Sequence, residues 1–278
     1  MQIILASAKI MNVSIKREQS ELVRFVEREK HGTKSNDKLK SITDISLSTP
    51  RFQNEADAFV RDMSQYSEET IAEMLGCSQQ IAAQNRLRFM QFFDEKPKLP
   101  AILAYHGQAY KHLKAETLNV DDLNYAQGKL WITSFLYGLL RPLDGILPYR
   151  MEGHVELPCG AGQNMFGFWK SRLTDVLIDA VKADDGILIH LATEEYQHLF
   201  DWQRVRREVR IIQPLFYIRK GSDLKIQAVW AKTCRGAMTR FIIENRIDKP
   251  EDLCAFSYEG FAYEPTLGEP DFPHFIKE

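Results

Sequence analysis

The sequence predicts an α+β fold: a single compact domain over residues 1–278, with a mixed β-sheet, surrounding helices and a helix-hairpin-helix element. Two observations predict this class. Apolar segments typical of buried strands stand alone among amphipathic segments typical of helices, without the regular alternation of a βαβ ladder. In addition, residues 209–231 have the pattern of two strands joined by a Gly-Ser turn, which favours a sheet with antiparallel pairs.

The first part of the chain is predicted to hold a strand, an insertion and a helix. The apolar run at residues 2–6 predicts a buried strand that opens into a loop. The stretch at about 13–49 is polar, rich in Lys and Ser and without periodicity, so we expect a mobile surface insertion there. After Pro50, apolar residues recur at helical spacing at Ala56, Phe59 and Met63.

Residues 69–93 are predicted to form two helices folded about a glycine. Gly76 breaks the first helical pattern, and Ser78 can cap a second helix that runs from Gln79 to Phe89. The outer face of the second helix would carry Gln80, Gln84, Arg86 and Arg88. Helix–turn–helix and helix–hairpin–helix DNA binders share this arrangement with ordinary pairs of packed helices, and the residues alone leave the three interpretations open.

The rest of the chain continues the irregular order of strands and helices. The predicted strands are 101–105, 187–192, the pair within 209–231 and a last strand within 254–265. The predicted helices are 121–140, 166–186 and 232–247.

The bulk composition is that of a globular protein without a membrane segment. Hydrophobic residues make up 44% of the chain and charged residues 27%, with a net charge of −2. No apolar run approaches the roughly 18 residues that span a bilayer, and the first residues lack the basic leader of a secretory signal. We expect reduced thiols, a cytoplasmic location and no zinc site, because no CxxC motif links the four cysteines, Cys77, Cys159, Cys234 and Cys254.

Positive charge is concentrated in one segment of this slightly acidic chain. Between Arg204 and Arg246 there are 11 Lys and Arg against 3 Asp and Glu. Such a concentration attracts phosphate groups even on an acidic molecule. The basic stripe that we consider for DNA phosphates comprises Arg204, Arg206, Arg207, Arg210, Lys232, Arg235 and Arg240.

The predicted helix from Lys232 is the sharpest basic element of this stripe. At about 100° per residue, Lys232 and Arg235 share a side of the helix with Ile242 and Ile243, so their charges would flank apolar contacts. The helix follows a predicted strand, and its first amides could therefore face an anion. Pairing of its arginines with acids elsewhere in the chain would explain the pattern equally well.

A short Pro- and Gly-rich loop at 137–153 gathers two further arginines. Arginine forks bind carboxylates or phosphates through paired hydrogen bonds, so Arg141 and Arg150 are candidate anion-binding residues. Equally, Arg141 can pair with Asp144 and Arg150 with Glu152, which would only pin the loop.

Lys9 and Glu194 follow predicted strands and are candidates for chemistry. Lys9 can contact an anion or a carbonyl group, or simply remain solvated. Adjacent carboxylates such as Glu194 and Glu195 can do acid–base work, because like charges raise one pKa. The first turn of a helix would explain the same pair of acids.

Common catalytic and nucleotide-binding motifs are absent from the sequence. It contains no GxSxG, no GxxxxGK[ST] and no GxGxxG. The seven histidines show no HxxxH spacing. We therefore expect no cofactor and no metal site.

Four segments carry a family resemblance that extends from Met1 to about Tyr263. They are ILAYHGQAYKHLKAETLNVDDLNYAQ, SFLYGLLRPLDGILPYRMEG, IHLATEEYQHLF and AKTCRGAMTRFIIENRI. Together they closely resemble the YaaA family of bacterial peroxide-stress proteins, long catalogued as a domain of unknown function. The chain departs from the family pattern near its start, where SAKIMN stands in place of SPAK followed by Thr-Leu-Asp or Thr-Leu-Asn.

The resemblance implies a cytoplasmic protein that limits peroxide damage by keeping unincorporated iron low. It also implies binding of double-stranded DNA by a helix-hairpin-helix element on a compact fold with a basic cleft. Backbone contact of this kind positions the duplex without reading its bases. The DNA-binding candidates in this chain are Gly76, Ser78, Gln79, Gln80, Arg86 and Arg88.

An enzyme acting on a small anionic substrate is the alternative. The longest family-like segments lie in loops at strand ends, where sites tend to be placed on folds. The candidate anion site comprises Lys9, Arg141, Arg150, Lys232 and Arg235, and the catalytic candidates are Lys9, Tyr137 and Glu194. Convergence of these side chains on one closed pocket would favour the enzyme, and their spread along an open groove would favour DNA.

Overall fold

The computed structural model describes residues 1–13 and 46–278 and confirms the α+β class. Within these residues, two mixed five-stranded sheets and one two-stranded sheet stand where the sequence predicted a single sheet. The buried apolar side chains form one continuous cluster that runs from Met1 to Phe275.

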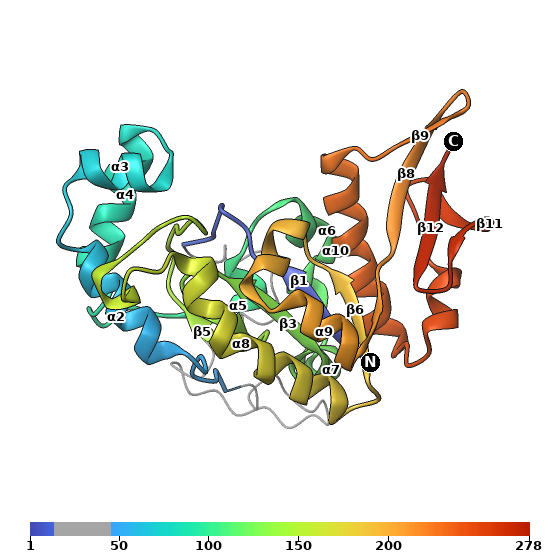
Figure 1. The fold of residues 1–278 in the computed structure, drawn as a ribbon, viewed down its shortest axis with the longest axis horizontal. Coiled ribbons are helices and arrows are strands. Elements are labelled where there is room, and N and C mark those ends of the chain that lie inside the picture. The colour runs from blue at the N-terminus through green and yellow to red at the C-terminus, as the bar shows by residue number, and fades with distance from the viewer. Residues whose placement is uncertain (14–45) are drawn as a thin grey trace, which may run out of the picture.

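The strands and helices are arranged as Figure 1 shows. The strands are β1 (Gln2–Ala6), β2 (Leu99–Pro100), β3 (Leu130–Ser134), β4 (Gly138–Leu140), β5 (Gly145–Ile146), β6 (Ile187–Leu191), β7 (Arg210–Ile212), β8 (Leu215–Lys220), β9 (Asp223–Lys225), β10 (Ser257–Tyr258), β11 (Phe261–Glu269) and β12 (Phe272–Lys277). The α-helices are α2 (Gln53–Met63), α3 (Glu68–Leu75), α4 (Gln79–Met90), α5 (Ala101–Ala104), α6 (Gln108–Leu113), α7 (Val120–Lys129), α8 (Met165–Lys182), α9 (Trp202–Glu208) and α10 (Ala228–Asn245). The 3₁₀ turns are η3 (Ala115–Thr117), η4 (Pro158–Gly160), η5 (Glu194–Leu199) and η6 (Pro250–Ala255).

The central sheet has the strand order β4-β3-β1-β6-β7, with β1 in the middle. β1 runs parallel to both β3 and β6, so the carboxyl ends of these three strands meet at one edge. All five residues of β3 are buried, as expected for a strand covered on both faces. In Figure 1, α8 and α9 lie in front of this sheet, whereas α10 packs with α6 and α7 behind it.

The second sheet has the order β10-β11-β12-β8-β9 and contains one parallel pair, β12 with β8. β8 and β9 form the hairpin that the Gly-Ser turn predicted, and Gly221 takes a positive φ of 63° in the turn. This hairpin projects from the upper right of the molecule in Figure 1. β7 precedes the hairpin but belongs to the central sheet, because Pro214 separates it from β8.

The two helices predicted about Gly76 are present as α3 and α4. Ser67 caps α3 by accepting a hydrogen bond from the amide of Thr70, and Ser78 caps α4 by accepting one from Ile81. Gly76 ends α3 in the left-handed conformation, with φ at 53°, where glycine carries no side-chain penalty. The pair stands at the upper left of Figure 1, on the side of the molecule opposite β8 and β9.

Two predicted elements are wrong in type. Residues 101–105 were predicted to be a strand but form the helical turn α5, because Ala and Leu favour helix and a short apolar run does not distinguish the two. The helix predicted over 121–140 ends at Lys129 and continues as β3 and β4. Trp131, Ile132 and Thr133 have high β-propensity, their backbone pairs with β1, and their side chains are buried on both faces of the sheet.

Two further boundaries differ from the prediction. The tail forms three strands, β10 to β12, rather than one. α10 begins at Ala228, so Ala228 to Trp230 are helical rather than the end of a strand. Most of the insertion predicted at about 13–49 lies outside the described residues, but Ser48, near its end, bridges Asp144 and donates a 2.7 Å hydrogen bond to its carboxylate.

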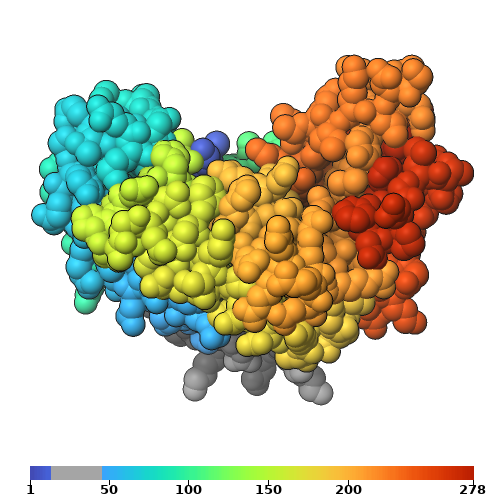
Figure 2. Space-filling view, viewed as in Figure 1, coloured from blue at the N-terminus to red at the C-terminus, as the bar shows by residue number. Residues whose placement is uncertain are grey.

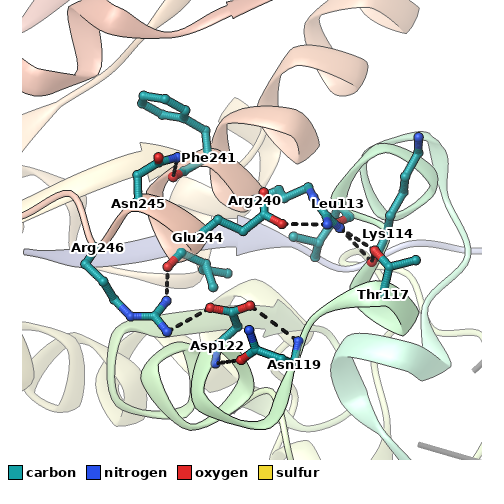
Figure 3. Close-up of polar contacts among 11 residues, drawn as sticks. Leu113, Lys114, Thr117, Asn119, Asp122, Arg240, Phe241, Glu244, Asn245 and Arg246 are labelled. Carbon is teal, nitrogen blue, oxygen red and sulfur yellow. Dashed lines mark hydrogen bonds and ion pairs between the residues drawn. The ribbon is translucent and has the colours of Figure 1, made fainter. Parts of the chain in front are cut away.

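The carboxyl half of α10 is fixed to α6 and α7 by two arginines (Figure 3). Arg240 donates hydrogen bonds to the carbonyl oxygens of Leu113 and Lys114 at 3.1 and 2.9 Å and pairs with Glu244 at 2.6 Å. Arg246 pairs at 2.7 Å with Asp122, which also belongs to the capping box of α7. These charges are therefore engaged in holding the helix in place.

The amino half of α10 lies unusually close to α6. A Cβ at Gly236 would overlap the carbonyl oxygen of Ala109, so only glycine permits this contact. Gln108 donates a 2.8 Å hydrogen bond to Thr233 across the same contact. The position of Lys232 and Arg235 relative to α6 therefore depends on this glycine.

No helix in the described part of the chain is both long and apolar enough to cross a bilayer.

Gly236→Ala is expected to destabilise the protein by about 1–3 kcal/mol, because the added methyl group meets backbone that cannot move without separating α6 from α10. Urea denaturation followed by circular dichroism measures the change. Gly128→Ala is the matched control, since a Cβ at Gly128 in α7 meets nothing within 4 Å and alanine favours helix. Equal stability of Gly236→Ala and the parent protein would show that the contact is looser than described.

Candidate anion-binding site

A pocket of about 310 Å³ lies at the carboxyl end of β1. From β1 the chain reaches β3 on one side and later returns to β6 on the other, so connecting segments diverge and leave a crevice between β1 and β6. Its walls come from the loop after β1, the start of α6, the residues after β6 and the amino half of α10. The lining residues are Leu5, Ala6, Ser7, Ala8, Lys9, Ile10, Gly107, Gln108, Ala109, Tyr110, Leu191, Thr193, Glu195, Tyr196, Lys232 and Arg235.

Backbone pairing fixes the loop that forms one wall. Met11 bridges Tyr105, and the amide of His106 donates a 2.9 Å hydrogen bond to the carbonyl oxygen of Ile10. The side chain of Asn12 donates at 2.8 Å to the carbonyl oxygen of Leu103. These contacts hold Lys9 at the mouth of the pocket.

Lys232 and Arg235 are the cations that α10 supplies to the pocket. Among the described residues, neither side chain has an ion pair or a hydrogen bond, although Arg235 is only partly exposed. Burial lowers the pKa of Arg235, yet a guanidinium starts high enough to stay protonated. The two charges are therefore available to an anion.

Lys9 and Arg150 share one buried carboxylate beside the pocket. The Nζ of Lys9 lies 2.7 Å from Glu152, and a guanidinium nitrogen of Arg150 lies 3.0 Å from it. Glu152 is 6% exposed, so the acid is enclosed by its two partners. The sequence analysis considered this Arg150–Glu152 ion pair as a contact that only stabilises the loop. Two cations around one carboxylate leave a net charge of +1 in the group.

Hydrogen-bonded tyrosines back the pocket. The hydroxyl groups of Ser7 and Tyr196 lie 3.0 Å apart, and Tyr110 donates at 3.0 Å to the carbonyl oxygen of Ala6. Tyr149 lies 2.5 Å from Ser134 and 2.7 Å from Tyr105, measured between hydroxyl oxygens. Burial is the main cause that raises the pKa of Tyr149 to about 12. The tyrosines are thus neutral at ordinary pH and form a rigid polar wall.

Three residues predicted for the anion or catalytic site lie away from the pocket. Tyr137 is buried in the core, where its hydroxyl accepts from the amide of Leu147 at 3.4 Å, and burial raises its pKa. Arg141 lies over the ring of Trp131 at 3.2 Å from its centroid, and burial lowers its pKa to about 10. Glu194 is exposed at the start of η5, the helical turn that the sequence offered as the alternative explanation.

The sequence drew attention to Glu195 beside Glu194 but placed only Glu194 among the catalytic candidates, and it missed Gln108 and the pair of Ser7 and Tyr196. Both acids are exposed in η5, and Glu195 rather than Glu194 lines the pocket. The adjacency of the two acids was visible, but their directions depend on the exact start of the turn. Gln108 lies in a segment predicted to follow a strand, and only its packing against α10 brings it to the site.

The hairpin turn after α3 is exposed. Gly76, Ser78, Gln79 and Gln80 are all accessible, and among the described residues the amides of Gln79 and Gln80 have no hydrogen-bond acceptor. The amide of Ile81, by contrast, is already bonded to Ser78.

The two predicted arginines of α4 are engaged locally. Arg86 donates at 3.2 Å to the carbonyl oxygen of Tyr66, and Arg88 donates at 3.3 Å to the side chain of Asn85. Burial lowers the pKa of Arg88. Both bonds leave other guanidinium donors on each side chain without an internal partner among the described residues.

The basic stripe divides into paired and unpaired members. Arg204 pairs with Asp175 and Glu208, each at 2.7 Å. Arg210 pairs with Asp271 at 2.8 Å, and Arg240 pairs with Glu244. In the described part of the chain, the members without an ion pair are Arg206, Arg207, Lys232 and Arg235.

A wide hollow opens above the pocket in the space-filling view (Figure 2). The α3–α4 pair forms its left wall and the β8–β9 hairpin with the start of α10 its right wall. Residues after β1 reach its floor. The pocket that holds Lys232 and Arg235 therefore lies at the base of an open groove.

The fold and the site together define an α+β protein whose central sheet carries a cationic pocket at its carboxyl edge, with two cations, Lys232 and Arg235, that have no ion-pair partner among the described residues. Residues 1–267 match the family described as peroxide stress protein YaaA. The chain belongs to this family.

Several curated relatives carry the name UPF0246 protein. The protein from Phocaeicola vulgatus is 50% identical over 218 residues, which cover 78% of this chain and 86% of the relative. The protein from Bacteroides thetaiotaomicron is 44% identical over 227 residues, which cover 81% and 88%. The protein from Porphyromonas gingivalis is 38% identical over 236 residues, which cover 84% and 92%.

The buried tyrosines predict a loss of stability at alkaline pH. The pKa values of Tyr105, Tyr110, Tyr137, Tyr149 and Tyr196 are raised in the folded state, chiefly by burial. The folded state therefore holds protons that the unfolded chain releases above about pH 10, so stability is full below that pH and falls above it by about 1.4 kcal/mol per pH unit for each such tyrosine.

Near-ultraviolet absorbance of tyrosinate, followed together with circular dichroism, measures this effect. Of the ten tyrosines in the chain, these five should ionise only when the protein unfolds. Tyr149→Phe should make the alkaline fall in stability shallower by about one proton. Ionisation of all ten tyrosines before any loss of structure would contradict the prediction.

Proposed function

We propose that this YaaA-family protein binds double-stranded DNA without strong sequence preference and limits peroxide damage by lowering free iron in the cytoplasm. Membership in the peroxide stress family is carried by the match over residues 1–267. DNA binding and the lowering of free iron are proposed beyond this family membership, and each has its own support and its own test.

The groove is the observation that carries the DNA-binding part. Its two walls are far enough apart to leave an open trough, and its base holds cations without an internal partner among the described residues (Figure 2). A polyanion gains most from charges that no neighbouring acid already satisfies. Lys232 and Arg235 meet this condition, whereas Arg204, Arg210 and Arg240 do not.

The hairpin supplies a second kind of phosphate contact at the left wall. The free amides of Gln79 and Gln80 stand at the amino end of α4, where the helix dipole adds positive potential. Gly76 has no Cβ, so a phosphate could approach the turn closely. Contacts of this type hold the backbone of the duplex and read no base.

DNA binding is expected to weaken steeply with salt and to depend on the hairpin turn. If about four phosphates are contacted, log affinity should fall against log salt with a slope of about −3.6. Gln80→Glu should weaken binding by about tenfold, because the new carboxylate faces the phosphate while still suiting the helix terminus. Fluorescence anisotropy of a labelled duplex over a range of salt concentrations measures both quantities.

Asn54→Asp is the matched control for the hairpin variant. Asn54 is also an exposed amide at the second residue of a helix, α2, whose amino end lies on the opposite side of the molecule from the groove. It should leave both affinity and slope unchanged. Binding that ignores salt, or equal affinities for the two variants, would exclude this mode of DNA binding.

A small anionic ligand is the second candidate, because Lys9, Lys232 and Arg235 line one pocket. Glu195 is the carboxylate present there and would take the proton-transfer role considered for Glu194. Lys9 remains a catalytic candidate in this proposal. It is paired with Glu152. Tyr137 is buried in the core. Arg141 donates to Gln2 and to the carbonyl oxygen of Leu130, at the amino ends of β1 and β3, so neither residue takes part.

The lowering of free iron is supported by membership in the peroxide stress family. In the described part of the chain, no three His, Cys, Asp or Glu side chains gather closely enough to hold a metal ion, so the proposal assigns no iron ion to these residues.

Deletion of the gene in its host is expected to raise free intracellular iron during peroxide exposure. Electron paramagnetic resonance of chelated iron in whole cells measures the pool. Reintroduction of the parent protein, or of Asn54→Asp, should return the pool to its original level. An unchanged pool in the deletion strain would remove the iron part of the proposal and leave DNA binding to its own test.

A further inference from the structure

We propose that the pocket at the end of β1 binds one nucleotide unit, with its phosphate at Lys232 and Arg235 and its base against the apolar wall. The inference rests on the proposed function, since it names the ligand of the same site. The nucleotide can be a free mononucleotide or a residue extruded from a duplex that lies in the groove. Both sources share the chemistry that the pocket would recognise.

The charges that line the pocket are of both signs. Lys232 and Arg235 come from α10, and Glu195 comes from η5. In the described part of the chain, Glu195 has no cation as an ion-pair partner. A bare inorganic anion gains from the first two groups and is repelled by the third. A ligand with an anionic end and hydrogen-bond donors at the other end satisfies all three, and a nucleotide is such a ligand.

The rest of the lining is largely apolar. It includes Leu5, Ala8, Ile10, Ala109 and Leu191, together with the tyrosines at its back. Tyr196 stacks on Phe135 with a ring separation of 4.8 Å and an angle of 15°, so its ring is held in a fixed plane. Aromatic and aliphatic walls of this kind suit the face of a base.

The pocket has the size and the polar groups that a base requires. Its volume of about 310 Å³ lies at the lower end of the range for small-molecule sites and exceeds what a phosphate fills. Gln108 is held in place by its hydrogen bond to Thr233, and its carbonyl oxygen has no donor among the described residues. Thr193 lines the pocket without capping η5 through its side chain. These groups can contact the edge of a base.

The absence of both common phosphate loops is consistent with this mode of binding. In those loops the phosphate meets backbone amides of a glycine-rich turn. Here the cations are side chains of a long helix, and the glycine that lines the pocket, Gly107, serves the close approach of the loop after β1 at Ala8. The phosphate would therefore be held by charge and by guanidinium hydrogen bonds.

The first test uses free ligands and the full chain. Isothermal titration calorimetry is carried out with the four nucleoside monophosphates, with inorganic phosphate and with the four nucleosides. At least one monophosphate should bind about tenfold or more tightly than inorganic phosphate and than the corresponding nucleoside. Arg235→Gln should weaken that binding by at least about tenfold, because a charge-assisted hydrogen bond is lost. Thr193→Trp should abolish it by filling the pocket.

The second test uses DNA that carries one 2-aminopurine. Its fluorescence should rise on binding to the parent protein if the base leaves the stack, and Thr193→Trp should bind the same duplex without the rise. Circular dichroism shows whether each variant is folded. If Thr193→Trp does not fold, Arg235→Gln, which adds no bulk, is used in its place.

The outcomes separate this inference from the proposed function. Tight binding of a mononucleotide, or a fluorescence rise that Thr193→Trp removes, supports the nucleotide site and identifies its source. Absence of both overturns it, as does phosphate that binds as well as every monophosphate. Salt-dependent duplex binding without either signal leaves the DNA-binding proposal standing, whereas mononucleotide binding without duplex binding overturns that proposal and keeps the nucleotide site.

Discussion

The close packing of α10 against α6 is the contact on which the candidate site depends. Gly236 allows the backbone of α10 to lie against Ala109, and Gly107 similarly allows the loop after β1 to approach, since a Cβ there would meet Ala8 at 2.6 Å. Arg240 and Arg246 fix the other end of α10 (Figure 3). The helix is therefore held at both ends, and Lys232 and Arg235, which have no ion-pair partner in the described part of the chain, line the pocket from a rigid element.

Pairing separates the structural charges of this molecule from the available ones. Arg240, Arg246 and Arg204 contact acids or carbonyl oxygens and hold elements together. Lys232 and Arg235 have no such partner among the described residues and line the pocket at the carboxyl end of β1. Because the net charge is only −2, attraction of an anion must come from this local distribution rather than from the molecule as a whole.

The periodic spacing of apolar residues predicted the helices and strands that bury only one face. The pair α3 and α4, the helix α8 and the hairpin of β8 and β9 all lie where the spacing of apolar residues and the turn glycines placed them. Short apolar runs also predicted the buried strands β1 and β6, but the pattern failed at one long buried stretch. Residues 130–140 lie in the centre of the structure, so their apolar residues follow neither period, and the preceding helical pattern was extended too far.

The sequence by itself determined the α+β class, the family and the local concentration of positive charge, because these depend on residue types and on short-range spacing. Only the tertiary structure decided which charges are free. Arg240 donates to carbonyl oxygens at the end of α6, whereas Arg235, on an earlier turn of α10, lines the pocket. The difference between Glu194 and Glu195 arises from the exact start of η5. The contacts that fix α10 against α6 join residues about 125 positions apart in the sequence, and no local pattern records them.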